Sequence, residues 1–494
     1  MRTAPRSVFR AARAGHTLVP LLAAALVAAP ASAALTQKVL DNGLTLIVKH
    51  DAGSDIAGVE VMIRVGQALE GKDRVGLRGV LQEVILRGMQ ERIDDPAWAS
   101  LAEQRDASDE RRLFNASTDW DYVECYGTVT SDRLADCCRF LAATVFDPGI
   151  TEERQRQVVE SMSPLLDEAR ATGNVQPPPG LREAHALLRK AMSGGRDPGL
   201  PLYGTPASLA ALSLDDLKGF HAKYYVPENM CVAVVSPLSD EDAAAAVTQA
   251  FGARPRSGTA VPPPQPPETF LHGVEVGGST ALHEAFIRDE DVACMMVGVP
   301  VPTAPEKEAC AADVIYVALG RPGGRLASDT ELEKSLTDVY YLGPVPHGQP
   351  PVPMPAFSTS PAPGAEQIDS VRALLSRADA PGAYIAVQAW VDPLRLNDAQ
   401  GAIVRLLNGL REKPLTDPEL QAAKDSAINA YARAHETKRD VAWLLARPAI
   451  LGRNASEEET YAQTVQALTA QDIQQIAARY FTEPSIAVVL PLSP

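Results

Sequence analysis

One stretch of sequence occurs twice, and this repeat most constrains the fold. Residues 211–225 reappear in similar form at 467–481, and each copy is followed by an apolar run that ends in proline, at 237 and 491. The two copies start at Ala211 and Ala467, so they lie about half a chain apart in a protein of 494 residues. That spacing is far longer than the roughly 20–50 residues of a solenoid unit. We therefore expect two homologous halves.

Strand and helix patterns alternate within both halves. In the first half, Asn42-Gly43 favours a hairpin turn, and 59–65 carries β-branched residues at every odd position, the period of a half-buried strand. Further strands are predicted at 122–129, 231–235, 293–298 and 383–391, and helices at 131–146, 151–171, 214–225, 397–411 and 418–434. The pattern predicts an α+β protein of two homologous domains, each a mixed sheet flanked by helices. Each domain could itself consist of an internal pair of similar units.

The first 33 residues have the features of a secretory signal. Four arginines precede an apolar run at 18–29, and Ala31-Ser32-Ala33 is a small-residue cleavage site. A membrane anchor is the competing interpretation, but the run is shorter than the roughly 20 residues that span a bilayer. We expect cleavage before Ala34, a periplasmic location and no membrane insertion afterwards.

Composition sets the remaining boundaries. The proline-rich segment 255–268 predicts a linker between an N-terminal domain at 34–254 and a C-terminal domain at 269–494, and 343–364 is predicted to be a surface loop or insertion.

The formal net charge of -16 becomes about -20 once the four signal arginines are removed, which disfavours binding to nucleic acid but suits binding to basic peptides. The six cysteines form no C-x-x-C, so we expect mostly buried thiols with at most one or two disulfides.

The segment 76–89 has the layout of a catalytic helix, with an opening glycine, an apolar face and a closing Arg-Gly. Seven segments in order resemble the pitrilysin, insulinase and mitochondrial processing peptidase family of zinc proteases: 40–44, 76–89, 115–118, 204–206, 220–227, 324–326 and 419–424. The resemblance implies two related α+β domains that face each other across a chamber. It also implies an active site on the first domain, extended peptide substrates and, often, paired subunits.

The residues at the expected zinc site are of the wrong types. In the family motif H-x-x-E-H, two histidines on one helical face bind zinc and the glutamate deprotonates the metal-bound water. The resemblance places these positions at Gly79, Gln82 and Glu83. Glycine offers no ligand, and an amide cannot accept a proton from water.

The third ligand of the family, a glutamate on a later helix, falls at Met162, with Ser161 as the alternative and Glu160 only after a shift of two residues. A rival site could combine Glu83 and Glu160 with His185 or His221, but their spacing and types are weak for zinc. Packing is the better interpretation of His221. We expect no metal in this chain and zinc in a partner subunit.

In the second half, the resemblance assigns a substrate-holding arginine and tyrosine to Arg325 and Tyr340. Arg325 could donate a forked pair of hydrogen bonds to a peptide carbonyl or carboxylate, and Tyr340 a single one. Two extra residues between Arg325 and Glu331 leave the register open, so Tyr341 could take the role. A purely structural arginine and tyrosine are an equal alternative.

These observations lead to one main hypothesis. The chain is a non-catalytic subunit that pairs with an active H-x-x-E-H subunit and helps to hold extended peptides. The alternative is a scaffold or binding protein that keeps the peptidase fold without any proteolytic role, and an independent peptidase with a rearranged site ranks third.

Overall fold

A computed structural model describes residues 35–103, 113–119, 121–171, 180–192, 201–260, 282–287, 293–302, 306–321, 324–326, 328–329, 332, 371–376 and 383–491. The signal segment, Tyr340, Tyr341, the loop 343–364 and part of the linker 255–268 lie outside the described residues. The domain boundaries therefore stay predictions.

The first half contains a mixed sheet whose strand order is β1-β2-β6-β3-β5-β4. Its strands are β1 (Thr36–Val39), β2 (Thr45–His50), β3 (Ile56–Ile63), β4 (Phe114–Thr118), β5 (Val123–Thr130) and β6 (Met230–Ser236). β2 and β6 run parallel, and the other neighbours are antiparallel. β1 and β2 form the predicted hairpin, in which Gly43 has a φ of 89° that suits glycine.

The second half repeats this arrangement. Its strands are β7 (Leu282–Ile287), β8 (Ala293–Pro300), β9 (Val371–Ser376), β10 (Tyr384–Val391) and β11 (Ser485–Pro491). Their order, β7-β11-β8-β10-β9, matches β2-β6-β3-β5-β4 of the first sheet, again with one parallel pair, β7 and β11. Equal strand order and sense confirm the prediction of two homologous α+β halves.

Helices cover both faces of each sheet. The first half contributes α1 (Leu77–Arg92), α2 (Ala99–Ala102), α3 (Leu134–Phe146), α4 (Glu152–Ala171), α5 (Leu181–Met192), α6 (Pro206–Ala210), α7 (Leu214–Tyr224) and α8 (Asp240–Phe251). The second contributes α10 (Glu306–Gly320), α12 (Leu396–Glu412), α13 (Asp417–Arg433), α14 (Lys438–Ile450), α15 (Glu457–Ala467) and α16 (Ala470–Tyr480). None of the helices in the described part is long and apolar enough to cross a membrane.

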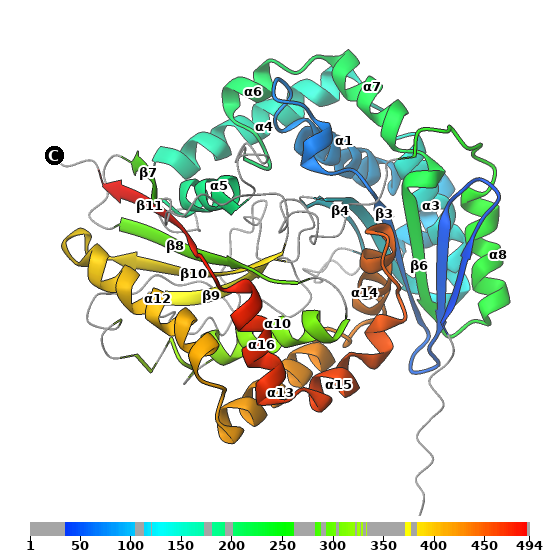
Figure 1. The fold of residues 1–494 in the computed structure, drawn as a ribbon. Coiled ribbons are helices and arrows are strands. Elements are labelled where there is room, and N and C mark those ends of the chain that lie inside the picture. The colour runs from blue at the N-terminus through cyan, green and yellow to red at the C-terminus, as the bar shows by residue number, and fades with distance from the viewer. Residues whose placement is uncertain are drawn as a thin grey trace, which may run out of the picture.

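The two halves exchange one helix each. α14, from the second half, packs on β3 and β6 of the first sheet, and α5, from the first half, packs on β8 and β11 of the second. Figure 1 shows the sheets on opposite sides of the molecule, with α14 on the inner face of the first and α3 and α8 on its outer face. The first sheet therefore has a core on both faces. The chamber expected between the halves stays a prediction.

This exchange explains one wrong prediction. The alternating pattern at 59–65 indicated a half-buried strand, but β3 runs over Ile56–Ile63 and is buried from Ala57 onward on both faces. Val59 and Val61 pack toward the helices of their own half, whereas Met62 joins the apolar cluster formed with α14.

The cysteine prediction is confirmed. All six cysteines are buried free thiols, and burial raises the pKa of Cys138 to about 12. They therefore act as small apolar side chains.

Candidate degenerate active site

α1 begins where a glycine is required. Gly76 precedes the helix with a φ of 90°, and its N–H donates to Glu70 Oε2 at 2.9 Å. A β-carbon here would lie 2.7 Å from the carbonyl oxygen of Tyr203. Both the backbone angle and the close approach explain the opening glycine of the segment 76–89.

A buried ion pair fixes the first turn of α1. Arg78 is fully buried, and its Nε donates to Glu70 Oε1 at 2.9 Å. Its Nη1 donates to the carbonyl oxygens of Val65 at 2.8 Å and Asp119 at 2.6 Å. Burial raises the pKa of Glu70, and Arg78 and two backbone N–H groups oppose that shift. Sequence analysis missed this pair, although an arginine inside an apolar helical face was a usable signal.

Gly79, at the predicted first histidine position, lies against an aromatic ring. An added β-carbon would be 2.9 Å from Tyr203 Cδ1 and 3.5 Å from Tyr203 Cα. The ring of Tyr203 therefore occupies the space into which a side chain at 79 would extend. Burial raises the pKa of the Tyr203 hydroxyl, and the nearby Glu83 adds to the shift.

Gln82, at the predicted position of the catalytic base, donates a hydrogen bond to a backbone carbonyl group. Its Nε2 donates to the carbonyl oxygen of Ala116 on β4 at 2.7 Å, and its side chain is 2 % exposed. Glu83, at the predicted second histidine position, is half-buried. This face of α1 therefore offers one carboxylate and a hydrogen-bonded amide.

The later helix α4 packs against α1, and the three candidate positions on it differ in their surroundings. Met162 is 2 % exposed and belongs to the core of the first half. The alternative, Ser161, accepts a hydrogen bond from Arg87 Nη2 at 2.8 Å, and Glu160 is exposed to solvent. A thioether, a filled histidine space and an amide do not fit the H-x-x-E-H zinc site.

The rival zinc site is not assembled either. His221 Nε2 lies 2.8 Å from the carbonyl oxygen of Val145, which supports the packing interpretation. His185 Nε2 lies 2.6 Å from the Tyr384 hydroxyl, on the second sheet, and burial with Arg189 nearby lowers its pKa to about 3. Across the described ranges, no three His, Cys, Asp or Glu side chains gather closely enough to hold a metal.

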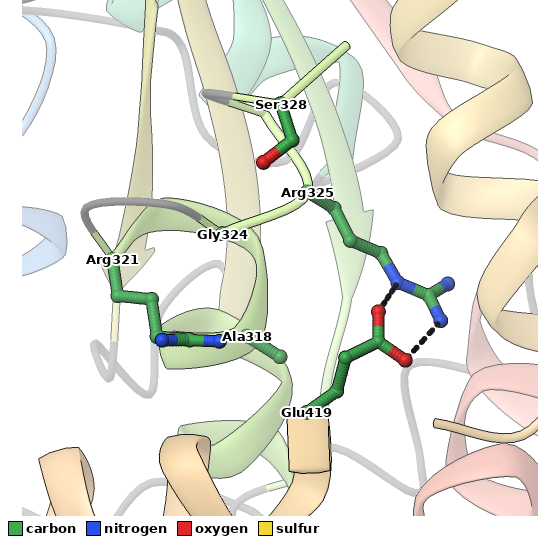
Figure 2. A pocket seen from close by; sticks show the side chains of 6 residues that line it. All are labelled: Ala318, Arg321, Gly324, Arg325, Ser328 and Glu419. Atoms are coloured by element: carbon green, nitrogen blue, oxygen red, sulfur yellow. Dashed lines mark hydrogen bonds and ion pairs between the residues drawn. The ribbon is translucent and has the colours of Figure 1, made fainter. Parts of the chain in front are cut away.

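Arg325 lies in a turn just after α10 and faces the start of α13. Its Nε donates to Glu419 Oε1 at 3.1 Å and its Nη2 to Oε2 at 3.5 Å. Figure 2 shows this fork beside Arg321 and Ser328, in a small pocket of about 90 Å³ that Ala318 and Gly324 also line. The structure thus brings together 324–326 and 419–424, two of the segments that carried the family resemblance.

Glu419 accepts hydrogen bonds from two residues, Arg325 and Thr416. Besides Arg325, it accepts hydrogen bonds from the backbone N–H and the hydroxyl of Thr416, the N-cap of α13. These donors hold the pKa of Glu419 at about 2 although its partial burial works in the opposite direction. Arg325 is therefore paired within the chain, and Tyr340 lies outside the described residues.

Comparisons with known proteins agree with this fold. Residues 211–348 match the model of the peptidase M16 inactive domain. An uncharacterized zinc protease of Mycobacterium leprae is 25% identical over 292 residues, which are 58% of this chain and 61% of that protein. The zinc protease YmxG of Bacillus subtilis, also uncharacterized, is 23% identical over 40% of this chain and 46% of its own length. The chain thus spans less than two thirds of these curated relatives.

Solved structures extend the likeness to nearly the whole chain. A protease from Helicobacter pylori superimposes with a TM-score of 0.68 at 17% identity, covering 93% of this chain and 100% of that one. A peptidase M16 inactive domain from Pseudomonas fluorescens gives 0.68 at 15% identity, with 93% and 98% covered. The periplasmic protease PqqL of Escherichia coli gives 0.61 at 15% identity, with 93% of this chain and 48% of that chain covered.

At these identities the structural matches show the fold, while the family model and the relatives named as zinc proteases agree with the resemblance to a zinc-peptidase family. The placement of the zinc-motif positions on α1 stays a prediction. The chain is thus similar to the M16 family of peptidases, the pitrilysin and insulinase family, through the inactive-domain match at residues 211–348 and through its zinc-protease relatives.

Proposed function

We propose that the chain is a non-catalytic subunit of a periplasmic peptidase pair and helps an active H-x-x-E-H partner to hold extended peptides. The observation that carries the proposal is the state of α1: the Tyr203 ring fills the space at Gly79, and Gln82 is bound to Ala116. Neither residue can bind zinc or deprotonate water as the family motif does. The retained two-half fold supports a role that uses the framework without the chemistry.

The periplasmic location rests on the signal-like residues 1–33. PqqL, which shares the fold, is described as a periplasmic protease and supports the same compartment. The acidic composition, with a formal net charge of -16, supports basic peptides as the class that the pair handles.

Arg325 is the residue through which we propose that this subunit acts on substrate. Its Nη1 makes no hydrogen bond with the described residues, so the guanidinium could donate to a peptide carbonyl without leaving Glu419. The same ion pair also favours the second candidate function, a scaffold, because an arginine in a turn that pairs with Glu419 at the start of α13 has a sufficient structural role.

Reconstitution with the partner separates the two functions. Co-purification from the native host should yield a second protein that carries H-x-x-E-H. In that pair, Arg325→Ala should lower peptide cleavage about tenfold, the effect of one lost charged hydrogen bond. Lys307→Ala, which removes another cation from an ion pair of the same half, should leave cleavage unchanged.

A scaffold would show full cleavage in both variants. Chelator-sensitive cleavage and stoichiometric zinc in this chain alone would overturn both candidates, because both assign the chemistry elsewhere.

A further inference from the structure

β4 is the last strand of the first sheet among the described strands, so one of its sides faces away from the sheet. Alternate residues of an antiparallel strand bond to the neighbour and away from it. Thr128 N–H donates to the carbonyl of Leu113, and Asp119 N–H to that of Tyr122, so odd-numbered residues bond to β5. The even-numbered residues, Ala116 among them, direct their N–H and C=O outward.

An outward row of backbone groups can accept an extended peptide as an additional strand unless the protein blocks it. At the centre of β4 both groups are already used. The carbonyl oxygen of Ala116 accepts from Gln82 Nε2 at 2.7 Å, and its N–H donates to Asn115 Oδ1 at 3.0 Å. Ala116 is 3 % exposed.

The same helix makes a second contact farther along the edge. Arg78 lies four residues before Gln82, so both side chains extend from one face of α1. Arg78 Nη1 donates to Thr118 Oγ1 at 3.2 Å and to the carbonyl oxygen of Asp119 at 2.6 Å. Asp119 is odd-numbered and Thr118 Oγ1 is a side-chain atom, so Arg78 holds α1 against the end of β4, whereas Gln82 supplies the donor to an outward carbonyl oxygen, that of Ala116.

We propose that α1 closes the outer edge of the first sheet to incoming strands, with Gln82 in the place of a peptide donor. Extended peptides then contact this chain on other surfaces. The inference concerns the first half alone and holds whether or not Arg325 has the role proposed above.

The chemistry of residue 82 makes the closure possible. A glutamine amide donates to a carbonyl oxygen, whereas an ionised glutamate of the same length can only accept. The Gln82→Glu comparison is therefore made at about pH 9, because burial raises the pKa of a carboxyl. Gln82→Glu would therefore turn a carboxylate toward the carbonyl oxygen of Ala116 and release it. Gln82→Ala removes the donor altogether, so the two variants open the edge by different routes.

The test uses the full chain and a fluorescein-labelled peptide of alternating valine and threonine with a lysine at each end. Fluorescence anisotropy should show that Gln82→Ala and Gln82→Glu bind the peptide about tenfold more tightly than the wild type does. This difference corresponds to about one hydrogen bond. Hydrogen exchange should show that the peptide protects 113–119 in these variants and not in the wild type.

Gln155→Ala is the matched control. Gln155 is also a buried glutamine of the first half, and its Nε2 donates to the carbonyl oxygen of Leu212 at 2.7 Å, away from β4. This variant should bind the peptide as the wild type does.

Protection of 113–119 by the peptide in the wild-type chain would overturn the proposal, and this result does not depend on how any variant folds. So would equal affinity of wild type and both Gln82 variants, once their urea unfolding curves show that they are folded. If Gln82→Ala does not fold, the peptide affinity of the wild type is compared with that of Gln82→Glu alone, which keeps the volume of the side chain. Loss of cleavage by Arg325→Ala in the reconstituted pair is a separate result and leaves this one unaffected.

Discussion

Tyr203 determines which residues position 79 can hold. Alanine favours a helix over glycine by roughly 0.5–1 kcal/mol, but a β-carbon at 79 would lie 2.9 Å from Tyr203 Cδ1, a ring atom near the backbone. Overpacking of this kind costs about 1–3 kcal/mol, which outweighs the gain in propensity.

We therefore expect Gly79→Ala to lower the free energy of unfolding by about 1 kcal/mol, measured by urea denaturation. Gly219→Ala in α7 is the control, because nothing lies within 4 Å of its β-carbon, and it should stabilise by about 0.5–1 kcal/mol. In Tyr203→Ala the cost of Gly79→Ala should disappear. Equal stabilisation by both glycine substitutions would show that Tyr203 does not restrict residue 79.

Glu60 is a buried carboxyl with more acidic than basic neighbours. It lies on β3, its Oε2 is 3.4 Å from Arg439 Nε, and Glu124 and Asp440 are close. Burial first, and then Glu124, raise the pKa of Glu60 well above its ordinary value, while Arg439 opposes the shift. The folded state therefore prefers the protonated form, so the contribution of Glu60 to stability is complete below the ordinary carboxyl pKa and is lost as pH rises through the raised one.

Glu60→Gln should accordingly stabilise the chain by about 1 kcal/mol at pH 7.5, with the gain shrinking toward zero as the pH falls below about 4.5. Urea midpoints across this pH range measure the effect. Glu124→Gln should destabilise at pH 7.5, because the Glu124 carboxylate pairs with Arg439 at 3.1 Å and accepts from Ser117 at 2.6 Å. A gain for Glu60→Gln that persisted below pH 4 would contradict the assignment.

At the scale of elements, local pattern predicted the described strands of both sheets except β4, β7 and β9, but it predicted neither α14 nor what covers the sheets. The hairpin at Gly43 followed from two adjacent residues. The burial of β3 on both faces depends on α14, whose N-terminal turn lies almost 400 residues away in sequence. Periodicity describes one face of a strand, so a helix supplied by the other half cannot be inferred from it.

The contact between β3 and α14 depends on Gly58. A β-carbon there would lie 2.5 Å from the backbone nitrogen of Arg439 and 2.6 Å from the carbonyl carbon of Lys438. Lys438 Nζ also donates to the carbonyl oxygens of Asp51 and Ser54, at 2.5 and 2.8 Å, which fixes the N-terminus of α14 in place.

Gly58→Ala should therefore displace α14 and destabilise the chain by about 2 kcal/mol. Hydrogen exchange should quicken at 438–450 and stay unchanged at 181–192, since α5 packs on the other sheet. Equal exchange at 438–450 in variant and wild type would mean that the helix does not depend on this close approach.

At the scale of the whole molecule, the residue types at the predicted zinc-motif positions could be read from the sequence because the motif is local. Three contacts were not, namely Tyr203 with Gly79, Gln82 with Ala116, and Arg325 with Glu419. Each joins segments from 34 to 124 residues apart, and only the folded chain places them side by side. The exchanged helices likewise depend on contacts that are distant in sequence. α5 packs on β8 and β11, and α14 packs on the equivalent strands β3 and β6.

The exchange predicts that neither half folds alone. Without α14, the first sheet would expose Ile47, Met62 and Val235, and without α5 the second would expose Met296 and Trp390, all at most 1 % exposed in the intact chain. Burying each such side chain contributes about 1.5–3 kcal/mol, so the loss approaches the roughly 5–15 kcal/mol that stabilises a whole domain.

Residues 34–254 and 269–494, produced separately, should aggregate or bind a hydrophobic dye, and produced together they should form a soluble one-to-one complex. Cleavage of the folded chain within 255–268 is the control and should leave the halves associated on gel filtration. A monomeric first half that unfolds cooperatively by itself would show that α14 is dispensable and that the halves are joined by the linker alone.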